Sequence, residues 1–224
     1  MKKDVLDVCK TKEGSLETLK GILDEIDEPL QKLEAINTQD ENGKSVLYFC
    51  ILNRKVEISQ FLIETGADVN RDNLDGTTPL ILAAGYGNFE LVKQLIKNGA
   101  QIDAKRNDNA DAAYFAAEGG YLSILKLLLE NNPQIANRDS YKGRTLLGRA
   151  AYKGHLHVLE YLVTEHNVDI NRKNRNGDSP IRLANLACQS FRPTCDNLCA
   201  IINFLKENGA TDKTLLNCNC CALK

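Results

Sequence analysis

Three histidines, His155, His157 and His166, are the side chains of this chain best suited to proton transfer near neutral pH. Catalysis would also need a nucleophile, or a metal ion held beside them. The sequence contains no phosphate loop, no Gly-x-Ser-x-Gly and no His-Glu-x-x-His. His155 and His157 are two residues apart, so they cannot face each other within one helix. We therefore expect no enzymatic activity and no cofactor.

Six of the eight cysteines fall between Cys188 and Cys221. Among Cys188, Cys195, Cys199 and the tail thiols, the single Cys-x-x-Cys spacing is Cys218 to Cys221, and no second such pair accompanies it, so we predict no metal site. We interpret residues 213–224 first as a plain Cys-rich tail, then as a lipidated tail, and only third as part of a metal site. A disulfide ranks last, because we expect a reducing cytoplasmic location. Two early cysteines fall on helix faces and are expected in the core: Cys9 and Cys50.

Lipidation is the specific alternative for the tail. Cys221 is fourth from the end and is followed by Ala-Leu, as in a prenylation box, although Lys224 is not a usual final residue. Cys218 and Cys220 would then supply the second lipid that stable anchoring needs. On this alternative, Cys218, Cys220 and Cys221 hold a cytoplasmic protein at the membrane periphery.

The composition is that of an ordinary folded protein, with 224 residues, 43% hydrophobic residues and a net charge of −2. This balance gives no electrostatic case for nucleic acid. No apolar run approaches the roughly 18 residues of a membrane-spanning helix, and no apolar signal region follows the N-terminus. Residues 1–70 carry 9 Lys/Arg and 14 Asp/Glu, whereas residues 138–192 carry 10 and 5. We interpret these stretches as solvated faces of opposite sign.

The elements that would position these residues recur about every 33 residues, which is typical of a stacked array. In the clearest copy, Thr78 is placed to cap a helix and Pro79 suits its first position. Gly87 would end that helix in the left-handed conformation. Six residues are expected to face a core, two on this helix and four at helical spacing on a second one: Leu80, Leu82, Leu91, Val92, Leu95 and Ile96.

Thr78-Pro79-Leu80, Ala83-Ala84, Gly87 and Asn98-Gly99-Ala100 stand in the register of the ankyrin repeat family, which this chain resembles over nearly its whole length. The resemblance implies an all-α solenoid of stacked antiparallel helix pairs with finger-like turns. It places a degenerate capping repeat and connector at 1–37, and repeats within 38–212. The five repeats are expected at about 40–71, 73–105, 106–139, 140–173 and 174–212.

Three stretches depart from the pattern. The third repeat has Asp111-Ala112-Ala113 where Thr-Pro-Leu belongs, and Asn109 replaces the finger glycine. The fifth repeat carries an insertion near 188–197, either a tolerated surface loop or a binding loop. In the capping repeat, Gly14 marks the turn between two helices, and the segment 30–33 is expected to add a helical turn after Pro29.

Members of the family bind partners at the finger tips and at the solvent-facing ends of the first helices. By register, the partner-binding candidates in this chain are Leu74, Asp75, Thr77, Tyr86, Asn107, Asp108, Tyr141, Lys142, Arg144, Tyr152, Lys153 and Arg175. The Tyr and Arg residues come first, because interfaces favour them. The alternative for any single position is a hydrophilic, variable tip.

Two residues break the local pattern. Arg149 occupies the register position of Leu82, where burial of an unpaired guanidinium would cost several kcal/mol, so we expect an ion pair. Asn70 ends a run that resembles the recognition pattern of asparaginyl hydroxylases. We favour the interpretation that Asn70 bonds the turn to the next finger, with hydroxylation as an addition.

These features favour a protein–protein interaction adaptor or scaffold that binds a partner protein through finger tips and a concave helix face. The alternative is a membrane-peripheral effector anchored by lipid on the terminal cysteines, similar to effectors that intracellular pathogens place in a host cell. We expect a monomer with a protein partner, no nucleic acid and no transmembrane segment.

Overall fold

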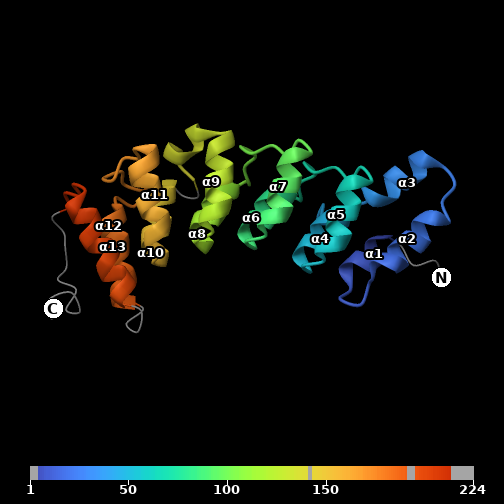
Figure 1. Ribbon diagram of the computed structural model, residues 1–224, viewed down its shortest axis with the longest axis horizontal. Coiled ribbons are helices and arrows are strands. Elements are labelled where there is room, and N and C mark those ends of the chain that lie inside the picture. Colours follow the sequence, from blue (N-terminus) through green and yellow to red (C-terminus); the bar gives the residue numbers. More distant parts are fainter. Residues whose placement is uncertain (1–4, 141–142, 191–194, 213–224) are drawn as a thin grey trace. The chain divides into compact units, whose positions relative to one another are not determined.

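The computed structural model describes residues 5–140, 143–190 and 195–212, and within these ranges it contains thirteen α-helices and no β-strand (Figure 1). In the same ranges, one isolated antiparallel bridge joins Gln39 to Ser45. None of the helices described combines the length and apolar character required to cross a bilayer. The all-α fold class expected from the sequence is confirmed.

The second repeat illustrates why the sequence forms helix pairs. Helix α6 (Pro79–Gly85) starts after Thr78, whose hydroxyl accepts a hydrogen bond from the Ile81 N–H at 3.3 Å. The chain then leaves the helix through Gly87, which has the predicted left-handed φ of 74°. Helix α7 (Phe89–Lys97) packs against α6 and buries Leu91, Val92 and Leu95.

Two residues of this repeat are less buried than expected. Leu82 and Ile96 were predicted to face the core, and both are only half-buried. Leu80 and Ala83 fill the buried side of α6. Because an α-helix turns about 100° per residue, Leu82 lies about 200° around the helix from Leu80. The face that carries Leu82 is therefore open to contacts outside the repeat.

The other repeats follow the same plan. Ser45, Asp111 and Thr145 are N-caps whose side chains each accept a hydrogen bond from the N–H three residues later. The helix pairs are α4 (Val46–Leu52) with α5 (Val56–Glu64), α8 (Ala112–Gly119) with α9 (Leu122–Asn131), α10 (Leu146–Lys153) with α11 (Leu156–His166), and α12 (Pro180–Ser190) with α13 (Cys195–Glu207). A 3-10 helix, η1 (Pro133–Asn137), follows α9.

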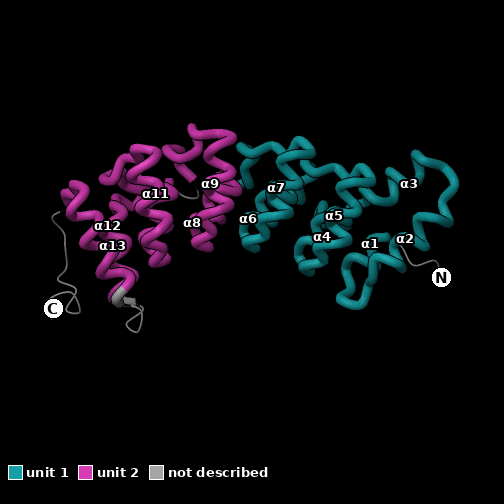
Figure 2. Tube along the Cα trace, viewed as in Figure 1, with its two compact units in different colours: residues 1–107 teal, residues 108–224 magenta. Residues whose placement is uncertain are grey.

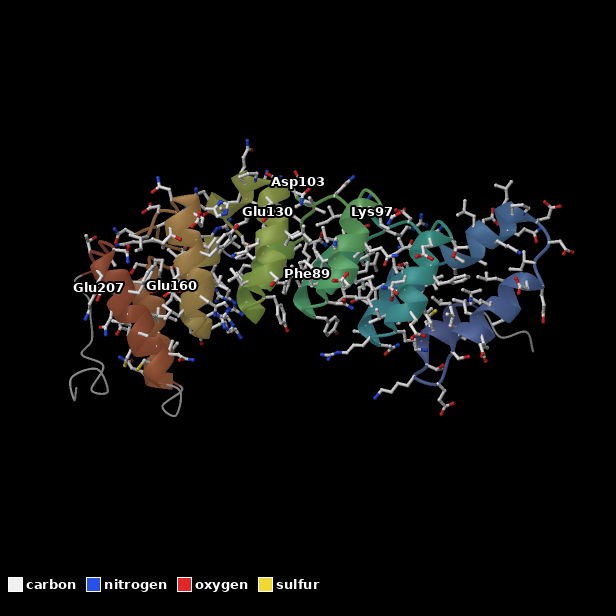
Figure 3. The ribbon with its side chains drawn as sticks, in the orientation of Figure 1. Phe89, Lys97, Asp103, Glu130, Glu160 and Glu207 are labelled. Atoms are coloured by element: carbon white, nitrogen blue, oxygen red, sulfur yellow. The ribbon has the colours of Figure 1, made fainter. Side chains whose placement is uncertain are left out.

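The second helix of each pair has a solvated side. Figure 3 labels four charged residues on these helices, Lys97 on α7, Glu130 on α9, Glu160 on α11 and Glu207 on α13, and all four are exposed. The opposite side of each second helix carries apolar residues at helical spacing, such as Leu125 and Leu128 of α9, which are fully buried.

The chain divides into two compact units, residues 1–107 and 108–224 (Figure 2). Unit 1 begins with three helices, α1 (Val5–Lys10), α2 (Leu16–Asp24) and α3 (Pro29–Ile36), before the first full repeat. Helix α1 packs on α4, α4 on α6, and α5 on α7. Cys9 and Cys50 are free thiols with no exposed surface, as predicted for core residues.

The first three helices are tied to the first repeat through backbone carbonyls. A Cβ atom on Gly14 would lie 1.8 Å from the carbonyl oxygen of Val8, so glycine allows the turn between α1 and α2. The Lys55 ammonium donates hydrogen bonds to the carbonyl oxygens of Val8 at 2.9 Å and Gly14 at 2.7 Å. After Pro29, the chain forms a helix of eight residues rather than one added turn, and Leu30 is 73% exposed on it.

In unit 2, helix α10 packs between α8 and α12, and α11 packs on α13. Asn109 takes the place of the finger glycine with a left-handed φ of 67°, a conformation that asparagine tolerates better than most residues. The fifth repeat differs from the prediction. The sequence predicted an insertion near 188–197 between its two helices, but α12 reaches Ser190 and α13 starts at Cys195, so both helices extend into that stretch. Cys188 stands at the register position of Gly87, so no glycine ends the helix there.

Candidate functional site

Charged, aromatic and leucine side chains lie together along the first helices of unit 2. We call this set the first-helix face of unit 2. The register position four residues after each N-cap is half-buried throughout, and it carries Phe115 on α8, Arg149 on α10 and Leu183 on α12. The face consists of Tyr114 and Glu118 from α8, Arg149, Tyr152 and Lys153 from α10, and Leu183 and Leu186 from α12.

Arg149 is the centre of this face. Its guanidinium Nη2 forms an ion pair with Glu118 Oε1, as the sequence predicted for a cation at this position. The guanidinium also lies 5.5 Å from the ring centroid of Tyr114 and 5.8 Å from that of Tyr152. The side chain is only 13% exposed, so these contacts hold it in one place.

Glu118 binds two cations. Besides Arg149, the Lys153 ammonium lies 3.2 Å from Glu118 Oε1. Burial disfavours the charged carboxylate, but the hydrogen bonds and charges of Arg149 and Lys153 outweigh burial and hold the pKa of Glu118 below its ordinary value. The carboxylate is therefore ionised at neutral pH, and two cationic side chains share one anionic partner.

Arg144 joins the face from the finger before α10. Burial raises the pKa of Tyr114 above its ordinary value, and the nearby guanidinium groups of Arg144 and Arg149 oppose that rise. The structure thus brings together three of the predicted partner-binding residues, Arg144, Tyr152 and Lys153. Glu118 and Tyr114, which the candidate set omitted, complete the network.

A cavity of about 280 Å³ opens on this face, and we call it the Gly148 hollow. Gly148 lies three residues after its N-cap, where the other first helices carry Tyr48, Ile81, Tyr114 and Arg182. Gly148 itself is buried, with Leu183 of α12 lying beside its backbone at one edge of the hollow. The lining comprises Arg144, Gly148, Arg149, Tyr152, Asp178, Leu183 and Leu186.

Gly148 was missed by sequence reasoning, although a signal was present. A glycine inside a helix lowers its stability by roughly 0.5–1 kcal/mol relative to alanine. Such a residue usually has a packing or binding reason to be there. Packing is one reason at this position, because a Cβ on buried Gly148 would lie 3.0 Å from Leu183 Cδ1 and 3.2 Å from Thr145 Oγ1. The hollow that Gly148 lines is a second reason.

The predicted residues of unit 1 fall into two groups. Leu74 is 69% exposed, Asp75 is exposed and Tyr86 is half-buried with the Arg54 guanidinium 5.5 Å from its ring, so all three remain binding candidates. Thr77 is only 7% exposed, and its N–H donates to Asn73 Oδ1 at 2.8 Å. The prediction that Thr77 is free to bind a partner is wrong, because it builds the finger.

Asn107 and Asp108 also have local roles. The Asn107 side-chain amide donates to the Leu74 carbonyl oxygen at 2.9 Å, and its N–H donates to the Asp75 carbonyl oxygen at 3.0 Å. Asp108 Oδ1 accepts from the Ala110 N–H at 3.1 Å. Arg175 is exposed, and its Cγ would lie 2.6 Å from a Cβ on Gly143. Two further candidates lie outside the described residues: Tyr141 and Lys142.

Asn70 connects two neighbouring turns. Its amide nitrogen donates to the Gly99 carbonyl oxygen at 3.0 Å, and its amide oxygen accepts from the Gln101 N–H at 2.7 Å. Asn171 makes the same pair of bonds, to the Gly209 carbonyl oxygen and from the Thr211 N–H. These contacts agree with the turn-bonding interpretation of Asn70. Its hydroxylation stays a prediction.

The cysteine chemistry of unit 2 is different from the expected order. Cys188 and Cys199, on the packed helices α12 and α13, are disulfide-bonded, so ranking a disulfide last was wrong for these two thiols. Within the described ranges, no three His, Cys, Asp or Glu side chains are grouped closely enough to hold a metal ion. The lipidation candidates all lie outside these ranges, and their modification stays a prediction: Cys218, Cys220 and Cys221.

Short helix pairs joined by fingers and packed on their neighbours define a helical repeat protein, a class that binds other proteins on extended surfaces. Residues 8–106 and 102–174 match the family described as Ankyrin repeats (3 copies). These matches cover well over half of the sequence. The chain therefore belongs to the ankyrin-repeat family, as its sequence motifs indicated, and ankyrin repeats are protein–protein interaction modules.

Three known proteins are similar to parts of this chain. Inversin of Gallus gallus is 37% identical over 60 residues, 27% of this chain and 5% of that protein. Ankyrin repeat protein OPG025 of Monkeypox virus is 39% identical over 46 residues, 20% of this chain and 7% of that protein. An ankyrin repeat protein of Rickettsia bellii is 36% identical over 80 residues, 35% of this chain and 46% of that protein. The matched segments span less than half the length of each relative.

Proposed function

We propose that this chain is an adaptor that binds a partner protein on the first-helix face of unit 2. The observation that carries the proposal is the fixed network of Arg149, Glu118 and Lys153 beside the Gly148 hollow. Tyr and Arg are the residues that contribute most to protein interfaces, and here Tyr152 and Arg144 line the same cavity.

Preorganisation supports this assignment. An Arg side chain loses up to about 2 kcal/mol of conformational free energy when a partner fixes it. Arg149 is already held by an ion pair and by two aromatic rings, so little of that cost remains for binding. The three helices that carry the face pack directly on one another, which fixes the spacing of its side chains.

The choice between a binding face and a merely solvated face rests on what the scaffold requires. Arg149 sits where other repeats place Phe or Leu, so the fold does not need a cation at this position. A solvated face would also not need a glycine inside α10. Both departures fall at one place, because Arg149 and Gly148 line the same cavity.

The test is affinity capture with quantitative mass spectrometry, in which wild type is compared with Tyr152→Ala. Tyr161→Ala is a matched control, since Tyr161 is a half-buried tyrosine on α11 with the Lys126 ammonium 5.2 Å from its ring. We expect Tyr152→Ala to lose at least one partner by about tenfold, equivalent to about 1.4 kcal/mol, while Tyr161→Ala retains it. Equal partner recovery from all three proteins would refute a binding role for this face.

A further inference from the structure

The Gly148 hollow also indicates what kind of partner segment the face recognises. We propose that it receives one large apolar side chain from an acidic segment of the partner protein. This inference rests on the proposed function, and it adds the chemistry of the partner. The argument uses the shape of the hollow, the residues that line it and the charges around it.

The size of the hollow favours one inserted side chain. At about 280 Å³ it is below the roughly 300–1,000 Å³ of sites that enclose whole small molecules. Leu183 and Leu186 supply apolar atoms from α12, and the Tyr152 ring supplies an aromatic surface from α10. Gly148 contributes only backbone to the lining, next to Leu183. When a hydrophobic side chain displaces water from an apolar surface of this kind, the free energy of binding becomes more favourable.

The charges around the hollow favour an acidic segment. Arg144, Arg149, Lys153 and Arg182 carry positive charge, whereas Glu118 and Asp178 carry negative charge. Asp139, in the finger before α10, is paired with Arg172 at 2.9 Å. Asp178 is paired with Arg182 at 2.9 Å, and Glu118 is shared by Arg149 and Lys153. Carboxylates on both sides of the inserted side chain would complement this excess, and a basic segment would be repelled.

Arg149 offers a specific contact as well. Its Nε atom is buried and has no hydrogen-bond partner in the described structure. An unsatisfied buried donor is costly, so native structures rarely keep one without a reason. Because Arg149 lines the hollow, an oxygen atom of the bound segment would satisfy this donor when binding shifts the side chains that cover it.

Filling the hollow tests the proposal without removing any contact. Gly148→Ile places at this position the residue that α6 carries at the same register, Ile81. The new side chain requires Leu183 to move, because Leu183 Cδ1 would lie 3.0 Å from its Cβ. Replacing a helix-interior glycine removes flexibility that weakens the helix, and this gain offsets part of the cost of moving Leu183. The unfolding temperature of the variant verifies that it is folded. Gly148→Ala is a smaller substitution at the same position, and it leaves most of the hollow open.

The experiment is selection of a random displayed peptide library on the full-length protein, with Gly148→Ile as the counter-selection target. We expect enriched peptides to share one Phe, Leu, Ile, Met or Trp flanked by Asp and Glu. In fluorescence polarisation, the best peptide should bind Gly148→Ile about tenfold or more weakly than wild type. The best peptide should also bind Lys153→Glu more weakly than wild type. A version of this peptide with Lys in place of the flanking Asp and Glu should not bind wild type.

Three results would overturn the proposal. They are a consensus without acidic residues, binding to a folded Gly148→Ile that equals wild type, and a library from which wild type enriches nothing. If Gly148→Ile does not fold, two other measurements still test the proposal. They are the affinity of the best peptide for Lys153→Glu and the affinity of the Lys-flanked peptide for wild type. The proposed function has a separate outcome, because loss of a captured partner by Tyr152→Ala would stand even if the hollow bound no acidic peptide.

Discussion

At the scale of the residue, Arg149 exemplifies a polar group placed where the fold would accept an apolar one. Leu82 and Leu183 occupy the same register position in other repeats. A partly buried ion pair contributes little net stability, because desolvation of the two charges offsets their attraction. Arg149 and Glu118 therefore shape a surface more than they stabilise the fold.

This difference predicts unequal effects of two substitutions. Arg149→Leu should change the free energy of unfolding by less than about 1 kcal/mol, because Leu suits the position and Glu118 keeps Lys153. Glu118→Ala should destabilise by about 1–2 kcal/mol, since it leaves a guanidinium that is only 13% exposed without its carboxylate. Because Glu118 is itself 27% exposed, the destabilisation expected for Glu118→Ala is smaller than the loss caused by breaking a fully buried pair.

Urea unfolding followed by circular dichroism measures both values. Arg149→Leu also provides a functional control, because it should weaken partner binding while leaving stability near that of wild type. A larger loss of stability for Arg149→Leu than for Glu118→Ala would contradict this account of the pair.

At the scale of the element, each helix begins and ends for a local reason, and glycines show how differently one residue type is used. Gly87 adopts a left-handed conformation that ends α6. Gly14 allows a close approach to the carbonyl of Val8, and Gly148 lines a hollow on α10. Only the first of these uses is visible in the repeat pattern.

Two glycines of the N-terminal helices provide a matched prediction. Gly14→Ala should destabilise unit 1 by about 2 kcal/mol or more, because its Cβ would meet a backbone oxygen that cannot move independently. Gly21→Ala should stabilise by about 0.5–1 kcal/mol, since Gly21 is exposed within α2 and a Cβ there meets nothing within 4 Å. Thermal unfolding of the two variants beside wild type measures both effects, and shifts of the same sign would count against the described turn.

At the scale of the whole molecule, stability is a sum of repeats and of contacts between neighbours. Helix α1 packs on α4 and α4 on α6, whereas α10 packs between α8 and α12. Each helix thus depends chiefly on the elements beside it. A local defect should therefore have a local effect.

Hydrogen exchange followed by mass spectrometry checks this locality with Gly14→Ala. We expect faster exchange of backbone amides in α1, α2 and α4, because these helices pack on the altered turn. Amides of α12 and α13 should exchange at wild-type rates. Gly21→Ala is the control and should slow exchange in α2. An equal increase in α12 and α13 would show that the chain unfolds as one cooperative unit.

The amino-acid sequence by itself determined the helix pairs, their caps and the left-handed turns. Thr78, Pro79 and Gly87 act on residues a few positions away, so their effect can be predicted without knowing the tertiary structure. The repeat register also predicted an ion pair for Arg149, because Arg149 occupies the position of Leu82. Its partner could not be named, because Glu118 is 31 residues away along the chain.

Only the tertiary structure decided which surface these elements form. Packing of α8, α10 and α12 brings Glu118, Arg149 and Lys153 together, and it places Leu183 and Leu186 over the backbone of Gly148. It also showed that Thr77 belongs to a finger and that α12 continues through Cys188. A cavity and a charge network depend on side chains from several repeats, so no single repeat of the sequence contains them.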